Sequence, residues 1–172
     1  MQKCLKILRY IKMNKIYDTI GIEETIVINE AQKKDSKKIS EIHMSRFPKS
    51  YGIEYIKSLI KNDIYLILVA KKRNKIIGFI IIQKVIDVSE IITIAIEKNH
   101  ESLGIGHQLI LNVITILKES NVKLITLEVS STNIRAINLY VKNNFKKKSL
   151  RKNYYTDQFG KKTDAYLYEQ KL

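Results

Sequence analysis

The first chemically informative segment is Leu103-Gly104-Ile105-Gly106-His107, which places two glycines at the start of a helical pattern. Glycine lets the backbone approach a ligand closely, and the N–H groups in the first turn of a helix have no intrahelical partner. Such groups bind anions, so we expect this segment to hold a pyrophosphate. The segment lacks the third glycine of a dinucleotide-binding fingerprint and the Lys-Ser/Thr pair of a nucleoside-triphosphate loop.

Two side chains further along the chain are suited to acid–base chemistry. Glu128 falls in the apolar segment Lys123–Val129, whose alternation predicts a strand, and a partly buried carboxylate there is a candidate general base. Tyr140 lies seven residues after Asn133, so the two share one face of a predicted helix, and its phenol is a candidate general acid. The competing interpretations are a sheet carboxylate paired with a lysine and a core aromatic ring.

Hydrophobic periodicity predicts the elements that position these residues. Strands are expected at residues 25–29, 64–71, 76–85, 90–97, 123–129, 145–154 and 164–171, and helices at 36–46, 52–61, 104–119 and 133–142. This order predicts an α/β (α+β) fold with a mixed sheet, in which three consecutive strands form a meander and the two later strand–helix–strand passages favour parallel pairing. Residues 1–23 are expected to be a basic amphipathic extension with an additional helix, and residues 24–172 a single domain.

A longer pattern connects the predicted strand at 123–129 to the helix that follows it. The run Thr126–Asn133 continues into Ala136, Leu139 and Tyr140, and together with the glycine pair it resembles the GNAT superfamily of acyl-CoA N-acyltransferases. Two further segments are similar to those of protein N-terminal acetyltransferases, among them the ribosomal-protein alanine (RimI-type) enzymes: Phe47–Tyr51 and Arg151–Tyr155. The resemblance implies a mostly antiparallel seven-stranded sheet flanked by about four helices. It also implies direct transfer of an acetyl group to a protein N-terminus.

The same resemblance assigns roles to individual residues. Acetyl-CoA is the implied cosubstrate, with no metal, and it is expected along Thr93, Ile94, Ile96, Gly104, Ile105, Gly106, His107, Asn133 and Tyr140. The acceptor peptide is expected between two walls made of Phe47, Pro48, Tyr51, Tyr154 and Tyr155. Glu128 is then the base for the amine, and Tyr140 the acid for the departing thiolate. A peptide α-amine, with a pKa of about 7.7–8.0, needs only a modest base, whereas a lysine side chain at about 10.4 needs a strong one.

The donor segment departs from the family pattern at two positions. Glu101 and Leu103 stand where the family usually has Gln or Arg and a basic residue. An acid beside a pyrophosphate opposes binding unless it turns to solvent or is compensated by positive charge. We therefore expect that Glu101→Gln leaves the affinity for acetyl-CoA equal or tighter.

The composition excludes several classes of protein. With 172 residues, 45% of them hydrophobic, the chain can bury the core of one domain. Cys4 is the only cysteine, which excludes a disulfide framework and a multi-thiolate metal site and fits a reducing, cytoplasmic location. No window approaches the roughly 18 uninterrupted apolar residues that a membrane span requires.

The formal net charge of +14 leaves two other functions open. The basic residues are spread along the whole chain, which favours a general attraction for anionic ligands over a dedicated nucleic-acid surface. One alternative is acetylation of a small amine or amino sugar. The other is a non-catalytic module that binds RNA or the ribosome through the N-terminal segment and the run Lys146-Lys147-Lys148.

Overall fold

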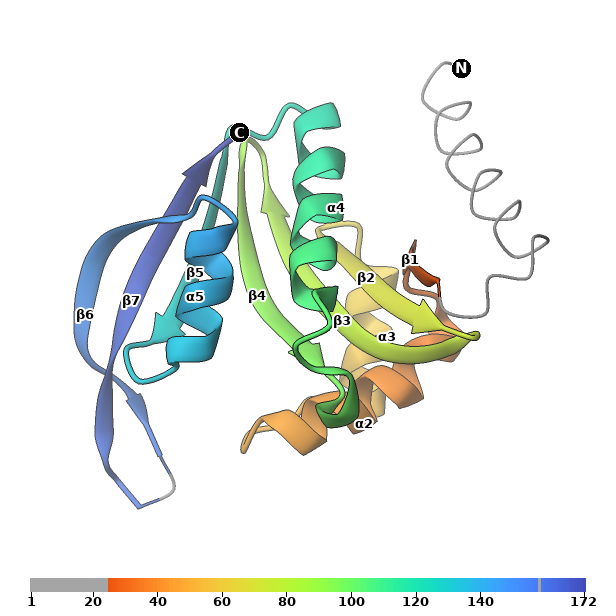
Figure 1. Cartoon of the computed structure of the whole chain (residues 1–172), viewed down its shortest axis with the longest axis horizontal. Helices are drawn as coiled ribbons and strands as arrows, with labels where there is room; N and C mark the ends of the chain where they lie inside the picture. Colours follow the sequence, from red (N-terminus) through yellow and green to blue (C-terminus); the bar gives the residue numbers. More distant parts are fainter. Residues whose placement is uncertain (1–24, 158) are drawn as a thin grey trace.

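The computed structural model describes residues 25–157 and 159–172, so the predicted N-terminal extension lies outside the described residues. The strands are β1 (Ile26–Glu30), β2 (Tyr65–Lys72), β3 (Lys75–Val85), β4 (Val88–Ile96), β5 (Leu124–Ser130), β6 (Lys146–Thr156) and β7 (Lys162–Lys171). The helices are α2 (Ser36–Arg46), α3 (Ile53–Lys61), α4 (Ile105–Glu119) and α5 (Ile134–Lys142), with short 3-10 turns at Lys33–Asp35 and Lys98–His100. Every strand and helix predicted within the described residues is present, with ends that differ by at most two residues (Figure 1).

The described strands form one seven-stranded sheet in the order β1-β2-β3-β4-β5-β7-β6. Every neighbouring pair is antiparallel except β4 and β5, and the predicted meander is present as β2-β3-β4. Of the two passages expected to give parallel pairs, the one through α4 does so. The expectation for the passage through α5 is wrong, because β7 follows β6 in a hairpin and lies between β5 and β6.

Helices cover both faces of the sheet, and each covered face has its own core. On one face α4 and α5 pack on the strands, and Leu109, Val113 and Tyr140 belong to this core. On the other face α2 and α3 cover β2, β3 and β4, where Phe79 is fully buried. The burial of the strands follows their content of apolar residues. The isoleucine-rich strand β3 is buried along most of its length, whereas the lysine-rich strand β6 is exposed throughout. In the part of the chain that the structure describes, no helix is both long and apolar enough to cross a membrane.

The sheet opens between β4 and β5. Their parallel pairing ends where Ile91 lies beside Leu127, although both strands continue past this point. A bulge at Ile92 accompanies the end of the pairing, because the register of β4 with β3 skips this residue. The bulge changes the alternation of side chains, so that Ile91 and Ile94 both belong to the α4 core. Beyond the bulge β4 pairs with β3 alone, and β4 and β5 diverge (Figure 1).

Candidate active site

The glycine segment forms the start of α4. Gly104 precedes the helix with a φ of +75°, a left-handed conformation that favours glycine. The first intrahelical hydrogen bond is donated by the N–H of Gln108 to the carbonyl of Gly104, at 3.0 Å. The N–H groups of Ile105, Gly106 and His107 therefore lie at the positive end of a 15-residue helix, which is the geometry of an anion seat.

Gly106 also sets the distance between two helices. A Cβ atom at this position would lie 3.1 Å from Cδ2 of Leu139 in α5, so the absent side chain lets α4 and α5 approach each other. A large side chain at Gly106 would disturb this packing as well as any ligand. Among the described residues, nothing lies within 4 Å of a Cβ atom built at Gly104. Gly104 is therefore the better position at which to test the anion seat.

Two polar side chains of the predicted cofactor site hold the helices in place. His107 Nδ1 lies 2.8 Å from Oδ1 of the buried Asn143, whose Nδ2 donates to the carbonyl of Leu139. Because that amide oxygen accepts, the imidazole donates through Nδ1 and links the first turn of α4 to the end of α5. Asn133 caps α5, with its Oδ1 accepting from the N–H of Ala136 at 3.1 Å. The backbone N–H of His107 and the amide N–H₂ of Asn133 remain as donors for a ligand.

The predicted cofactor residues of β4 lie beyond the bulge, on the border of the opening. The Thr93 hydroxyl is buried and finds no hydrogen-bond partner among the described residues. A buried hydroxyl without a partner is costly, so it marks a place where a ligand or a water molecule completes the bonding. Ile94 and Ile96 pack against the α4 core. No described strand pairs with this part of β4 on its β5 side, and the backbone polar groups there suit the amides of a pantetheine arm.

Glu128 projects from β5 on the face opposite α4 and α5. Its neighbours Leu127 and Val129 belong to the α4 core, so strand alternation directs Glu128 to the other face. The side chain is 14% exposed and forms an ion pair with Arg151 of β6 at 2.5 Å. The prediction that this carboxylate is partly buried is confirmed, and its cationic partner is an arginine instead of a lysine.

Glu90 is a second carboxylate on this face, and the sequence patterns did not single it out. It lies beside Thr126 in the β4–β5 register, which places Glu128 two residues further along the neighbouring strand on the same side. Burial and the negative charge of Glu128 raise the pKa of Glu90. The alternation of apolar and polar residues along β4 indicates on which face of the sheet Glu90 lies. It does not indicate that Glu128 is nearby, because this depends on the register between β4 and β5.

Three tyrosines connect the carboxylates to α5. A hydrogen bond to Glu128 raises the pKa of the Tyr154 phenol. Burial, followed by the charge of Glu128, raises the pKa of Tyr155 to about 12. Burial also raises the pKa of Tyr140, with Tyr155 as the second cause. Tyr155 therefore interacts with both the candidate base and the candidate acid, and all three phenols stay protonated at neutral pH.

The first predicted acceptor wall is an aromatic stack at the end of α2. The rings of His43 and Tyr51 stack with their centroids 4.2 Å apart, and the Phe47 ring lies 4.4 Å from His43. The N–H of Tyr51 donates to His43 Nδ1, and burial lowers the pKa of His43, so the imidazole is neutral at pH 7. His43 is a packing residue. It orders the turn that contains Pro48.

The second predicted wall consists of Tyr154 and Tyr155 near the end of β6. Their rings meet edge to face with centroids 5.1 Å apart, and both residues remain partly exposed. The pairing of β6 with β7 is irregular between Arg151 and Tyr155, where Asn153 has a φ of +55°. This irregularity brings two consecutive tyrosines toward the carboxylates, because Tyr154 bonds Glu128 while Tyr155 interacts with it electrostatically.

Glu101 begins the loop that leads into α4, and two arginines bind its carboxylate. Arg46, the last residue of α2, donates to Oε1, and Arg135 of α5 donates to Oε2. Arg135 also donates to Ser102 Oγ at 2.8 Å. The negative charge at Glu101 is therefore compensated within the fold. The same two arginines bring the positive charge that the loop itself lacks.

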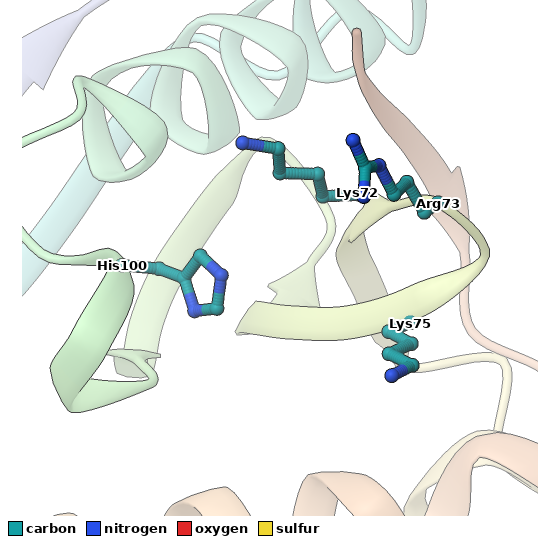
Figure 2. A pocket seen from close by; sticks show the side chains of 4 residues that line it. All are labelled: Lys72, Arg73, Lys75 and His100. Atoms are coloured by element: carbon teal, nitrogen blue, oxygen red, sulfur yellow. The ribbon is translucent and has the colours of Figure 1, made fainter. Parts of the chain in front are cut away.

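A separate hollow of about 350 Å³ lies at the β2–β3 turn (Figure 2). It is lined by Lys72, Arg73, Lys75 and His100. None of these residues belongs to the predicted site, and three of the four are lysine or arginine, so we do not place the acetyl transfer in this hollow. Within the described ranges, no three His, Cys, Asp or Glu side chains lie close enough together to hold a metal ion.

Comparison with known protein families identifies the domain. The model of the acetyltransferase (GNAT) family matches residues 36–145. The chain belongs to the GNAT acetyltransferase family. The matched region runs from α2 to the end of the α5 segment and contains the glycine pair, both carboxylates and Tyr140.

Individual relatives of this GNAT domain have more specific names. The chain is 34% identical over 139 residues to the ribosomal protein bS18-alanine N-acetyltransferase of Haemophilus influenzae, covering 75% of this chain and 94% of that protein. It is 28% identical over 153 residues to the N-alpha-acetyltransferase of Sulfolobus acidocaldarius, covering 81% and 89%. The crystal structure of Arabidopsis thaliana NAA60 in complex with acetyl-CoA has a TM-score of 0.79 at 20% identity, covering 86% of this chain and 99% of that one. This structural similarity establishes the fold, in agreement with the sheet predicted from the sequence.

We predict that the anion seat of this GNAT domain is sensitive to charge at Gly104. Both Gly104→Glu and Gly104→Gln place a side chain in open space at a φ of +75° and share a backbone strain of about 1–2 kcal/mol. Only the glutamate adds negative charge at the N-terminus of α4. Calorimetric titration with CoA should give roughly tenfold weaker binding for Gly104→Glu than for Gly104→Gln. Equal affinities would show that the phosphates bind elsewhere.

Proposed function

We propose that this GNAT-family acetyltransferase transfers the acetyl group of acetyl-CoA directly to the N-terminal α-amine of a protein. The observation that carries the proposal is the pair of carboxylates, Glu90 and Glu128, on the strands that border the opening of the sheet. Its specific form is supported by the 34% identity to a relative named for N-acetylation of an alanine in ribosomal protein bS18. A ribosomal protein with an N-terminal alanine is therefore the acceptor we propose.

In this proposal the donor lies along β4 and the first turn of α4. The acetyl-CoA thioester supplies the activated acyl group. The N–H groups at the start of α4 bind its pyrophosphate, and the free polar groups of β4 beyond the bulge bind its pantetheine arm. The residues assigned to these contacts are those predicted from the sequence: Thr93, Ile94, Ile96, Gly104, Ile105, Gly106, His107, Asn133 and Tyr140.

The acceptor amine must be neutral when it attacks. A peptide α-amine has a pKa of about 7.7–8.0, so a nearby carboxylate needs to remove a proton from only part of the population at neutral pH. Glu128 receives this proton, directly or through water. Glu90 lies on the same face, and its raised pKa makes Glu90 a stronger base than an ordinary glutamate.

Acetyl transfer forms an N–C bond and breaks the C–S bond of the thioester, so CoA leaves as a thiolate. An ordinary thiol has a pKa of about 8.5, whereas burial raises the pKa of Tyr140 above its usual value near 10. Tyr140 therefore stays protonated and donates a hydrogen bond to the leaving sulfur. As the N–C bond forms, the amine nitrogen becomes positively charged and loses a proton to the carboxylates or to water, which balances the proton that the thiolate finally binds. A proton removed beforehand from an ammonium group passes to solvent.

The acceptor chain is assigned to the two aromatic walls, with Tyr154 and Tyr155 beside the carboxylates and Phe47, Pro48 and Tyr51 on the opposite side. A ribosomal-protein acceptor places the reaction in the cytoplasm. The net charge of +14 would favour contact with the anionic ribosome.

Peptide acetylation tests the proposed function. A peptide that begins with alanine should gain one acetyl group when it is incubated with acetyl-CoA and the full chain, as measured by mass spectrometry. The matched control is the same peptide with a blocked N-terminus and an internal lysine, which should gain none. Acetylation of the control, or of small amines alone, would contradict the proposal.

Removing the charge of either carboxylate should change how kcat/KM depends on pH. Glu128→Gln removes the proton acceptor and should lower kcat/KM most near pH 7, by roughly 10²-fold, with partial recovery above pH 8, where more of the α-amine is already neutral. Glu90→Gln should act in the same direction. Initial rates between pH 6 and 9 measure this dependence. Rates of both variants equal to the wild-type rate would refute the assignment.

Tyr140→Phe should separate transfer from cofactor binding. The substitution keeps the buried ring but removes the hydrogen-bond donor, so kcat should fall by roughly 10²-fold while the affinity for CoA changes little. Tyr168→Phe is the matched control, because Tyr168 is equally buried in the same core and has no proposed role. Steady-state kinetics together with calorimetry would detect the difference. Equal losses in the two variants would assign Tyr140 to packing alone.

A further inference from the structure

The Glu101 carboxylate joins three segments that surround the proposed site. Its two acceptor bonds reach Arg46, 55 residues earlier in the chain, and Arg135, 34 residues later. Arg46 ends α2 and Arg135 is in the first turn of α5, the helix that carries Tyr140. The partly buried Glu101 side chain thus links the end of α2, the loop before α4 and the start of α5.

The link to Arg46 bears directly on the acceptor loop, residues 47–51. Arg46 immediately precedes Phe47 and Pro48, so its contact with Glu101 ties the end of α2, where the acceptor loop begins, to the loop before α4. The other end of the loop is held independently, because Ser40 Oγ donates to the carbonyl of Tyr51 at 2.8 Å. The first end is attached to α2 by the bond from the Phe47 N–H to the His43 carbonyl at 3.0 Å, so the contact with Glu101 fixes this end relative to the loop before α4.

The link to Arg135 holds the loop before α4, residues 101–104, in an unusual conformation. We call this segment the donor loop. Ser102 has a φ of +63°, which is uncommon for a residue with a side chain, and Arg135 donates to its hydroxyl at 2.8 Å. A second ion pair, between Lys38 of α2 and Glu97 at 2.7 Å, ties α2 to the segment just before Glu101. The donor loop is therefore held from two sides.

The arrangement differs from an isolated ion pair on the surface. The Glu101 side chain is only 19% exposed, and its two oxygens have different arginine partners. An exposed single pair contributes little because solvent screens it, whereas a partly buried carboxylate shared by two guanidinium groups forms a network. Two guanidinium groups share one carboxylate, so the cluster retains net positive charge beside the anion seat.

We propose that Glu101 is a positioning residue, which holds the acceptor loop in a fixed place relative to the donor loop. The proposal rests on the proposed function for the identity of the two loops. It explains how an acid can occupy a position beside the anion seat. The local charge alone predicts only an effect of Glu101→Gln on the binding of acetyl-CoA. The positioning role predicts weaker binding of the acceptor peptide, with little effect on the binding of acetyl-CoA.

Steady-state kinetics of the full chain with acetyl-CoA and the alanine-initiated peptide test this role. Glu101→Gln keeps the shape of the side chain and should raise the KM for the peptide roughly 5- to 10-fold, with kcat and the KM for acetyl-CoA within about twofold of wild type. Glu101→Asp keeps the charge and should recover part of the loss. Arg46→Gln should raise the peptide KM similarly, and the double variant should be little worse than either single variant, because both remove the same contact.

Glu54→Gln provides the matched control. Its carboxylate pairs with Lys57 on exposed α3, so the variant has the same change in net charge without touching the loops, and its kinetic constants should be unchanged. An unchanged peptide KM in Glu101→Gln, an equal rise in Glu54→Gln, or additive effects of the Glu101 and Arg46 changes would overturn the positioning role. So would a joint fall of kcat and thermal midpoint without a change in peptide KM. A wild-type protein that acetylates no peptide would overturn the proposed function as well, whereas an active wild type with unaltered variants would overturn the positioning role alone.

Discussion

The end of the pairing between β4 and β5 is the constraint on which the candidate site depends. Buried backbone N–H and C=O groups need partners, so two adjacent strands normally pair along their whole shared length. Here β4 stays in place beyond Ile91 because β3 continues to pair with it to Ile96 and because side chains of both cores hold it from above and below. On the edge toward β5, the backbone polar groups of this part of β4 have no strand partner among the described residues. A ligand that contains amides can satisfy them in the manner of an added strand.

The opening also explains how residues from opposite faces of one sheet can act together. Glu128 projects from the face opposite α5, whereas Tyr140 belongs to the core beneath α5. A continuous sheet would separate a base and an acid arranged in this way. Tyr155 lies near the irregular end of β6; the charge of Glu128 contributes to raising its pKa, and Tyr155 in turn contributes to raising the pKa of Tyr140. The bulge and the divergence of the strands leave an opening between the two faces, through which we propose that these groups act on one substrate.

The sequence predicted the elements well because their apolar periods are clear and because few of them depend on distant partners. It also predicted that the paired glycines begin a helix, since glycines at a helix start have a local physical meaning. What it did not predict depends on register and on contacts between distant segments. Glu90 becomes relevant only through its place beside Thr126 on β5, and Glu101 only through two arginines from other helices. The prediction of a second parallel pair was wrong for the same reason, because β7, a strand later in the chain, lies beside β5.

The exposed outer strand β6 has a consequence for how the molecule behaves at high concentration. As the last strand of the sheet it presents one row of backbone donors and acceptors to any other extended chain. Its sequence contains five basic residues, Lys146, Lys147, Lys148, Arg151 and Lys152, and no acidic one. A second copy approaching edge to edge would bring like charges face to face, which opposes continued strand addition and fibre growth. Salt screens this repulsion, so colloidal stability should be greatest at low ionic strength.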